Sequence, residues 1–265
     1  MTHTAISAIA VLCLLAAFTA SALLANGRQD SRAIFICAAT MAGTLYWAWA
    51  HTWGVGLSTA LLASILATQV AFGLLLIFSS RDLLRLGGLI GPYLLLAAFF
   101  AAWLGHAHSE PPLSGEVSNW LLLHIALSVL GYGFLTVGAT ASLAVLLRER
   151  ALKRRTRSDF LDKLPSIAAA ERIELRGLAC AEIILGVGIL FGMAAELTTS
   201  GEFLQLTHKA LFSFLAFLLI GVVLFLQLKT GLAGRLAARL GLTAYLLVSL
   251  GYPGVKFVSS VLLAP

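Results

Sequence analysis

A succession of apolar stretches, each close to the length of one bilayer crossing, restricts the possible folds of this chain more than any other feature. Eight such stretches can be delimited, at about 4–25, 33–50, 56–78, 86–105, 120–147, 177–197, 209–228 and 240–262. An α-helix needs about 20 predominantly apolar residues to cross roughly 30 Å of hydrocarbon. The sequence therefore predicts an all-α, polytopic membrane helix bundle with about eight transmembrane helices.

The composition supports a lipid-embedded fold and argues against a soluble one. Hydrophobic residues make up 60% of the chain and charged residues only 11%, whereas soluble domains carry roughly 25% charged residues. The formal net charge of +6 does not indicate a nucleic-acid partner, because the lysines and arginines lie in short segments between apolar stretches instead of along one soluble face. We expect anionic lipid headgroups as their partners and no nucleic acid.

The basic residues also predict an orientation, because they occur in alternate connecting segments. The segments 51–55, 106–119 and 198–208 contain no Lys or Arg, whereas 148–176 contains nine. Cytoplasmic loops carry the excess of basic residues, so both termini are expected on the outer face. Residues Met1 to Ser7 include no Lys or Arg, and a secretory signal begins with a positive region. The first stretch is therefore expected to be a retained helix.

Polar content divides the chain into two expected parts. Residues 1–119 form a four-helix N-terminal membrane part with short loops and few polar residues inside its helices. Residues 120–265 form a second four-helix part with a basic cytoplasmic loop at 148–176. The second half of that loop, 166–176, is expected to be an amphipathic helix lying on the headgroups. Any chemistry is expected in the second part.

The histidines are the first candidates for a functional site, since all six fall on the predicted outer side: His3, His51, His106, His108, His124 and His208. Neutral imidazole binds haem iron and divalent metals. His124 lies one turn after Trp120, an interfacial anchor, and shares a helix face with Ser128 and Tyr132. Polar groups at that depth face the bundle interior or a cavity. His124 is thus either a ligand or a histidine bonded to a neighbouring helix.

Further polar residues near the outer side are candidates for the same site. His208 is a possible second axial or metal ligand beside His124, and Lys209 can meet a carboxylate such as a haem propionate. Tyr252 and Lys256 share one face of the last stretch with Tyr245 and Ser249. Lys256 either snorkels to the headgroups or adds a second positive charge for an anionic ligand.

Two features leave a different function open. Glu182 lies one to two turns inside the sixth stretch, where a carboxyl group indicates function. The loop segment from His106 through His108 to Glu110 offers three possible metal donors at close spacing. These residues would matter most in a cation-handling protein. A nucleophile–base pair, a carboxylate dyad and a phosphate-binding loop are all missing from the sequence, so we expect a binding protein and no enzyme.

Four segments of the second part resemble the cytochrome c assembly membrane proteins, the CcsA/CcmC-type haem-handling family. They are WLLLHIALSVLGYGFL at 120–135, LPSIAAAERIE at 164–174, THKALFSFLAFLL at 207–219 and GRLAARLGLTAYLLVSLGYPGVKFV at 234–258. The nearest branch is YpjD- or HemX-like. The resemblance implies a multi-pass protein of the bacterial inner membrane that binds haem near the outer face. His124 and His208-Lys209 match positions of the family's haem region.

The chain departs from the full synthetase members of that family because it lacks their tryptophan-rich WWD motif. Residues 198–208 read TTSGEFLQLTH instead, which argues against direct delivery of haem to an apocytochrome. The resemblance implies a b-type, non-covalent haem and a role in cytochrome c biogenesis or its regulation, with other assembly or membrane proteins as partners. The alternatives are an accessory protein for divalent cation tolerance or efflux, and a structural protein whose basic loop contacts a cytoplasmic enzyme.

Overall fold

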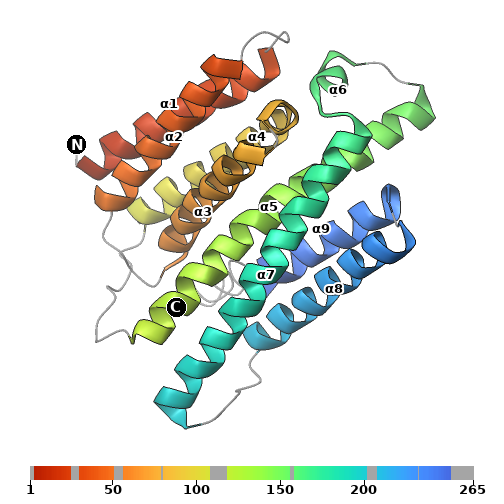
Figure 1. Ribbon diagram of the computed structural model, residues 1–265. Helices are drawn as coiled ribbons and strands as arrows, with labels where there is room; N and C mark the ends of the chain where they lie inside the picture. Colours follow the sequence, from red (N-terminus) through yellow and green to blue (C-terminus); the bar gives the residue numbers. More distant parts are fainter. Residues whose placement is uncertain are drawn as a thin grey trace.

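The structure is a computed structural model that describes residues 3–24, 30–50, 56–78, 80–107, 118–155, 158–201, 208–231 and 233–251. This part of the chain is almost entirely helical and includes no strand (Figure 1). Its helices are α1 (His3–Leu24), α2 (Asp30–Ala50), α3 (Leu57–Phe78), α4 (Ser80–Ala107), α5 (Asn119–Arg154), α6 (Asp159–Lys163), α7 (Ile167–Ser200), α8 (His208–Thr230) and α9 (Arg235–Ser249).

Five helices are long and apolar enough to cross a membrane within the described ranges. The candidate spans lie in α3, α4, α5, α7 and α8, and α1 contributes a shorter apolar run, Ile6–Ala22. The predicted fold class, a polytopic membrane helix bundle, is therefore confirmed. The count of eight crossings and the placement of both termini on the outer face stay predictions, as does the division at residue 119.

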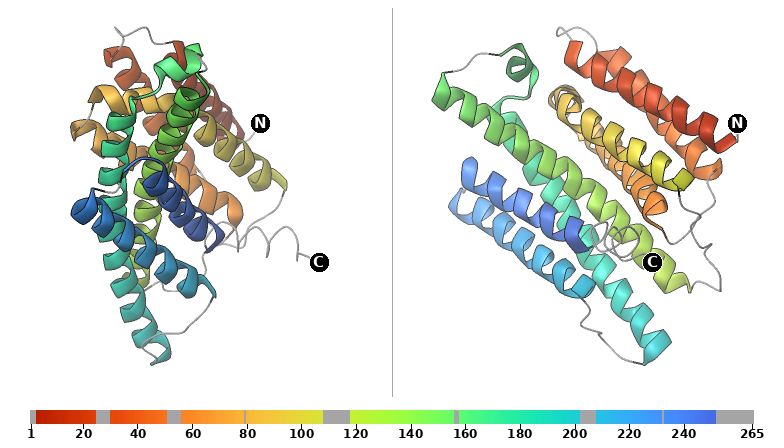
Figure 2. Two further views of the ribbon diagram at one scale, coloured as in Figure 1. Left: turned by 90° about the vertical axis from the view of Figure 1, so that its right-hand side faces the viewer. Right: turned by 180° about the vertical axis from the view of Figure 1, so that it is seen from behind.

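The long helix α5 lies at the centre of the bundle and packs against α3, α4, α7 and α9. On one side of it, α1 packs against α2 and α4; on the other, α8 packs against α9 and α7. Figures 1 and 2 show this order from the front and from behind. We call the end where α5 and α8 begin and α7 terminates the His124 end, and the opposite end the Arg148 end.

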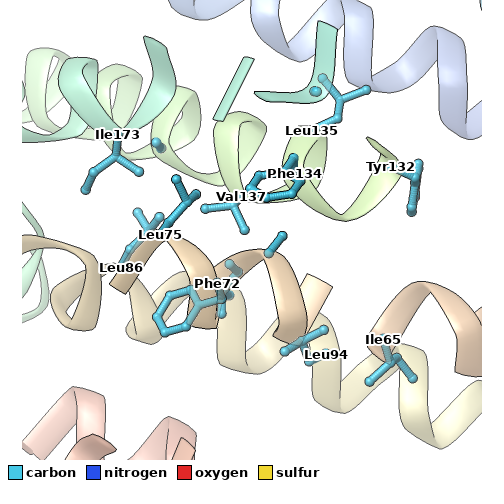
Figure 3. Packing of buried hydrophobic residues seen from close by; sticks show 14 of the residues in the cluster. Ile65, Phe72, Leu75, Leu86, Leu94, Tyr132, Phe134, Leu135, Val137 and Ile173 are labelled. Atoms are coloured by element: carbon cyan, nitrogen blue, oxygen red, sulfur yellow. The ribbon is translucent and has the colours of Figure 1, made fainter. Parts of the chain in front are cut away.

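Close approach of α5 to its neighbours depends on glycines, as is usual between membrane helices. A Cβ at Gly133 would overlap the carbonyl oxygen of Ala67 on α3. Likewise, a Cβ at Gly177 of α7 would lie 2.9 Å from the Cα of Gly138. Figure 3 shows the apolar layer between α5 and the helices α3 and α4, with Phe134 and Val137 of α5 on one side and Phe72 and Leu86 on the other.

The predicted basic loop 148–176 is shorter in the structure than hydropathy indicates. Helix α5 continues to Arg154 and α7 begins at Ile167, where the Oγ of Ser166 accepts a hydrogen bond from Ala169 N. Alanine, leucine, arginine and glutamate are strong helix formers, so the helices continue where apolarity ends. The segment expected as an amphipathic helix at 166–176 is helical from Ile167, but it is the first part of α7. It is not a separate helix lying on the headgroups, because Ile173 and Glu174 are buried inside the bundle.

Candidate functional site

His124 lies in the second turn of α5 and directs its imidazole at the backbone of α7. Its Nδ1 is 2.7 Å from the carbonyl oxygen of Gly188. A carbonyl oxygen only accepts hydrogen bonds, so Nδ1 carries the proton and donates it. In a neutral ring Nε2 is then unprotonated. Within the described ranges Nε2 has no hydrogen-bond partner. The contact that fixes His124 therefore leaves its second nitrogen available as a ligand.

The imidazole fits against α7 because a second glycine lies one turn further along that helix. A Cβ at Gly192 would be 2.7 Å from Nδ1 of His124 and 2.8 Å from its Cε1. Next to this contact, the Trp120 ring of α5 packs against the Phe191 ring of α7, with 5.6 Å between the ring centroids. Trp120 is also half exposed, as an interfacial anchor would be, and it does not line the cleft described next.

A cleft of about 180 Å³ lies beside His124, between α5, α7, α8 and α9. Its walls are mainly apolar, and its polar groups are the His124 ring with the hydroxyls of Ser128, Tyr132 and Ser213. The complete lining is His124, Ile125, Ser128, Val129, Tyr132, Leu185, Ile189, Ser213, Val248 and Gly251. The predicted stripe of His124, Ser128 and Tyr132 thus faces a cavity, as its spacing on the helix indicated.

Three tyrosine hydroxyls meet at the inner end of this cleft. The hydroxyl of Tyr132 lies 3.0 Å from that of Tyr245 and 3.5 Å from that of Tyr93, and the hydroxyls of Tyr245 and Tyr93 are 3.1 Å apart. Ser249 adds a fourth hydroxyl 3.2 Å from Tyr132. Each hydroxyl has one donor and two acceptor sites, so this cluster satisfies buried polar groups and joins α4, α5 and α9.

Carboxyl groups of α7 form a separate set towards the Arg148 end. Glu174 is fully buried, and its Oε1 accepts a hydrogen bond from the Ser142 hydroxyl at 2.9 Å. Glu171 accepts one from the backbone N–H of Gly234 at 2.6 Å. Both glutamates belong to the segment 164–174 quoted above, and they join α7 to α5 and to the start of α9.

Arg148 closes the turn between α5 and α7 at the same end. Its guanidinium donates to the carbonyl oxygens of Leu164 at 2.6 Å and Pro165 at 3.1 Å. Arg148, the first basic residue of the predicted loop, therefore binds the backbone just before α7.

Glu182 lies on α7 beside Gly221 of α8. A Cβ built at Gly221 would lie 2.9 Å from Oε1 of Glu182. Glu182 does not reach the cleft. The described residues hold no group of three or more His, Cys, Asp or Glu side chains that could bind a metal ion.

Several predicted site residues lie partly or wholly outside the described residues. His208 and Lys209 open α8 at the His124 end, but their side chains lie outside the described residues. Tyr252 and Lys256, and the predicted metal donors His108 and Glu110, lie outside them altogether. The roles of these residues stay predictions.

Sequence reasoning missed Tyr93, Gly188 and Gly192. Tyr93 is a single tyrosine in an apolar helix and follows Pro92, a pattern that carries no functional signal by itself. The two glycines have the small-xxx-small spacing of close helix contacts, and this spacing was the available signal. It does not reveal which side chain fills the space.

Comparison with known proteins places these features in a family. The Cytochrome C assembly protein family matches residues 3–263, so the match also includes the first part of the chain. An "Uncharacterized 28.8 kDa protein in nifR3-like 5'region" of Azospirillum brasilense is 42% identical over 221 residues, which cover 82% of this chain and 81% of that protein.

More distant relatives carry the name cytochrome c biogenesis protein CcsA. The one from Prochlorococcus marinus (strain MIT 9301) is 26% identical over 53% of this chain and 52% of its own length, and the one from Chlamydomonas reinhardtii is 25% identical over 65% and 49%. The chain thus spans about half the length of these CcsA relatives. No solved structure matches it. With nearly every residue covered by the family match, this chain belongs to the cytochrome c assembly protein family.

Proposed function

We propose that this protein binds haem and acts as a haem-handling factor in cytochrome c biogenesis or its regulation. It holds a b-type haem non-covalently, with His124 as one axial ligand. Its family supports the biological role, and the relatives named CcsA are cytochrome c biogenesis proteins by name. The haem-binding role is argued from the residues of this chain.

The observation that carries the proposal is the hydrogen bond from His124 Nδ1 to the Gly188 carbonyl. Histidines that ligate metals almost always donate the other ring N–H to a carboxylate, carbonyl or water, which fixes the tautomer and raises ligand basicity. His124 also lines a cleft and is not enclosed between two helices. The bond at 2.7 Å and the adjoining cleft together favour the ligand interpretation over a simple interhelical contact.

The cleft fits part of a porphyrin and not all of it. Sites that enclose a drug-sized ligand have volumes of about 300–1,000 Å³, and this cleft measures about 180 Å³. Its apolar walls suit a porphyrin edge, and His124 would supply the axial nitrogen. When bound, haem supplies an iron centre for coordination, and the chain supplies the ligand, the apolar contact and exclusion of water.

The second ligand and the propionate partner come from the start of α8. Ser213 of α8 lines the cleft, and His208 and Lys209 lie about one turn beyond it at the His124 end. Trp120, Tyr252 and Lys256 are proposed as outer contacts. We propose that the protein lies in the bacterial inner membrane with the His124 end outward, among anionic lipids and other cytochrome assembly proteins.

The test is a haem titration of the purified protein in mild detergent, followed by visible spectroscopy. The wild type is expected to give a stoichiometric Soret band. His124→Ala should lose most of that band, and His208→Ala should shift it through loss of one axial ligand. His51→Ala is the matched control, since it removes a histidine of another predicted outer loop and should leave the spectrum unchanged.

Chemical rescue sharpens the assignment. In His124→Gly, added imidazole should restore the band, because the free ligand occupies the space left by the side chain. A band that survives His124→Ala unchanged, or that is lost equally in His51→Ala, would rule out the proposed site. Haem that binds the wild type only in excess and without saturation would rule out the function.

A further inference from the structure

The contact between His124 and α7 has an unusual requirement. The acceptor is a main-chain carbonyl inside a helix, and such an oxygen is already bonded to the N–H four residues further along. A side chain from another helix reaches it only where the helix surface is open. Here the residue four positions after Gly188 is Gly192.

The space at Gly192 is filled by the imidazole itself. An added Cβ there would lie 2.7 Å from Nδ1 and 2.8 Å from Cε1 of His124. Real Cβ atoms essentially never approach other atoms within 3.0 Å, and ordinary contact begins at 3.4 Å. The ring is held at 2.7 Å from the Gly188 oxygen, so a methyl group at 192 requires it to move away from the position in which it makes this bond.

We propose that Gly192 is a positioning residue for the ligand nitrogen of His124. The missing side chain at 192 admits the imidazole to the Gly188 carbonyl. This contact fixes the proton on Nδ1 and leaves Nε2 unprotonated on a ring that lines the cleft. An alanine at 192 displaces the ring and breaks this bond, so that the proton is no longer held on Nδ1. The effect of Gly192 on haem binding rests on the proposed function. Its effect on the His124 tautomer does not, because the tautomer is a property of the haem-free protein.

Gly188 provides a matched control on the same helix. A Cβ at Gly188 would lie 3.5 Å from Leu127 Cβ and 3.6 Å from Ser128 N and Oγ, which is ordinary van der Waals contact. The acceptor is the main-chain oxygen, so Gly188→Ala keeps it. Gly188→Ala and Gly192→Ala are thus the same substitution, one helical turn apart, and only the second obstructs His124.

The first measurement needs no haem. Nitrogen-15 NMR of histidine-labelled, haem-free protein in nanodiscs distinguishes the protonated from the unprotonated ring nitrogens, and His124→Gln identifies the His124 signals among the six histidines. The wild type and Gly188→Ala should show Nδ1 protonated and Nε2 unprotonated. Gly192→Ala should show a mixture of tautomers. A wild-type ring protonated on Nε2, or a Gly192→Ala spectrum identical to that of the wild type, would overturn the inference.

The second measurement is the haem titration of the same variants. Loss of a hydrogen-bond partner to a metal-ligating histidine lowers affinity by about 10–100-fold, so Gly192→Ala should bind haem at least tenfold more weakly than Gly188→Ala. Circular dichroism and gel filtration report whether both variants remain folded. If the wild type binds no haem but shows the expected tautomer, the proposed function fails and the positioning role of Gly192 stands. If the wild type binds haem and Gly192→Ala binds it equally well, the positioning role fails.

Discussion

Replacing Tyr132 by phenylalanine removes the hydroxyl through which three helices meet at the inner end of the cleft. That hydroxyl lies 3.0 Å from Tyr245 and 3.2 Å from Ser249, both on α9, and 3.5 Å from Tyr93 on α4. The aromatic ring remains, so the stacked pair with Tyr245, at 5.6 Å between ring centroids, is expected to survive. The substitution therefore tests the hydrogen bonds separately from the packing.

The size of the effect follows from the number of bonds that are lost. Interhelical hydrogen bonds in membrane proteins contribute about 0.6 kcal/mol on average and about 1.7 kcal/mol at most. Two contacts of Tyr132 are within 3.2 Å and the third is at the limit of a hydrogen bond. We expect Tyr132→Phe to lower the free energy of unfolding by about 1–3 kcal/mol.

The assay is equilibrium unfolding in mixed micelles with increasing dodecyl sulfate, followed by circular dichroism. Tyr46→Phe serves as the control, because Tyr46 is half exposed on α2, where its ring lies beside Trp49. Exposed substitutions of this kind change stability by about 0.5 kcal/mol or less. The haem titration should show the same Soret position in Tyr132→Phe as in the wild type, since Tyr132 is not an axial ligand in the proposed site.

Equal stability of Tyr132→Phe and the wild type would show that the hydroxyl cluster does not join the helices as described. A shifted Soret band with unchanged stability would assign Tyr132 to the ligand set instead.

Three further predictions concern the helix contacts. Gly133→Ala brings a methyl group against the α3 backbone and should destabilise the protein by about 1–3 kcal/mol. Gly131→Ala should be tolerated, because the nearest contact of its methyl group is 3.5 Å. Equal unfolding curves for the two variants would contradict this prediction. Glu174→Gln keeps an acceptor for the serine hydroxyl and should stay near wild-type stability, but Glu174→Ala should lose about 2–4 kcal/mol by the same assay. The lysine in Arg148→Lys cannot reproduce the forked contact to two carbonyls, so the connection between α5 and α7 should be held less firmly. Trypsin should then cleave this connection faster than in the wild type. An unchanged cleavage rate would refute the role of the guanidinium.

The helices could be predicted from the sequence because apolar length is a local property. The stretch predicted at 56–78 is α3 almost to the residue, and 120–147 lies within α5. The helix at 166–176 was expected on the headgroups and not inside the bundle, because the pattern of an amphipathic helix does not reveal what its apolar face packs against. Ile173 is apolar and Glu174 is polar, yet both are buried. Neighbouring helices surround both side chains, and the Ser142 hydroxyl donates a hydrogen bond to Glu174.

The candidate site could be predicted only in part. His124, Ser128 and Tyr132 follow a four-residue spacing on one helix, so their common face was visible. Tyr93 and Gly192 belong to other helices, and their contact with that face depends on which helices pack together, which the sequence does not reveal. The glycine spacing shows that something approaches α7 closely. Only the structure shows that this neighbour is the His124 imidazole.

The central claim is that His124 presents its Nε2 to haem beside the cleft between α5 and α8. A structure of the haem-loaded protein in lipid nanodiscs tests it most directly. The prediction is a porphyrin edge against Ser128 and Ser213, with the iron bound to Nε2 of His124 and Nδ1 still on the Gly188 carbonyl. Iron bound elsewhere, or a His124 ring turned away from the porphyrin, would contradict it.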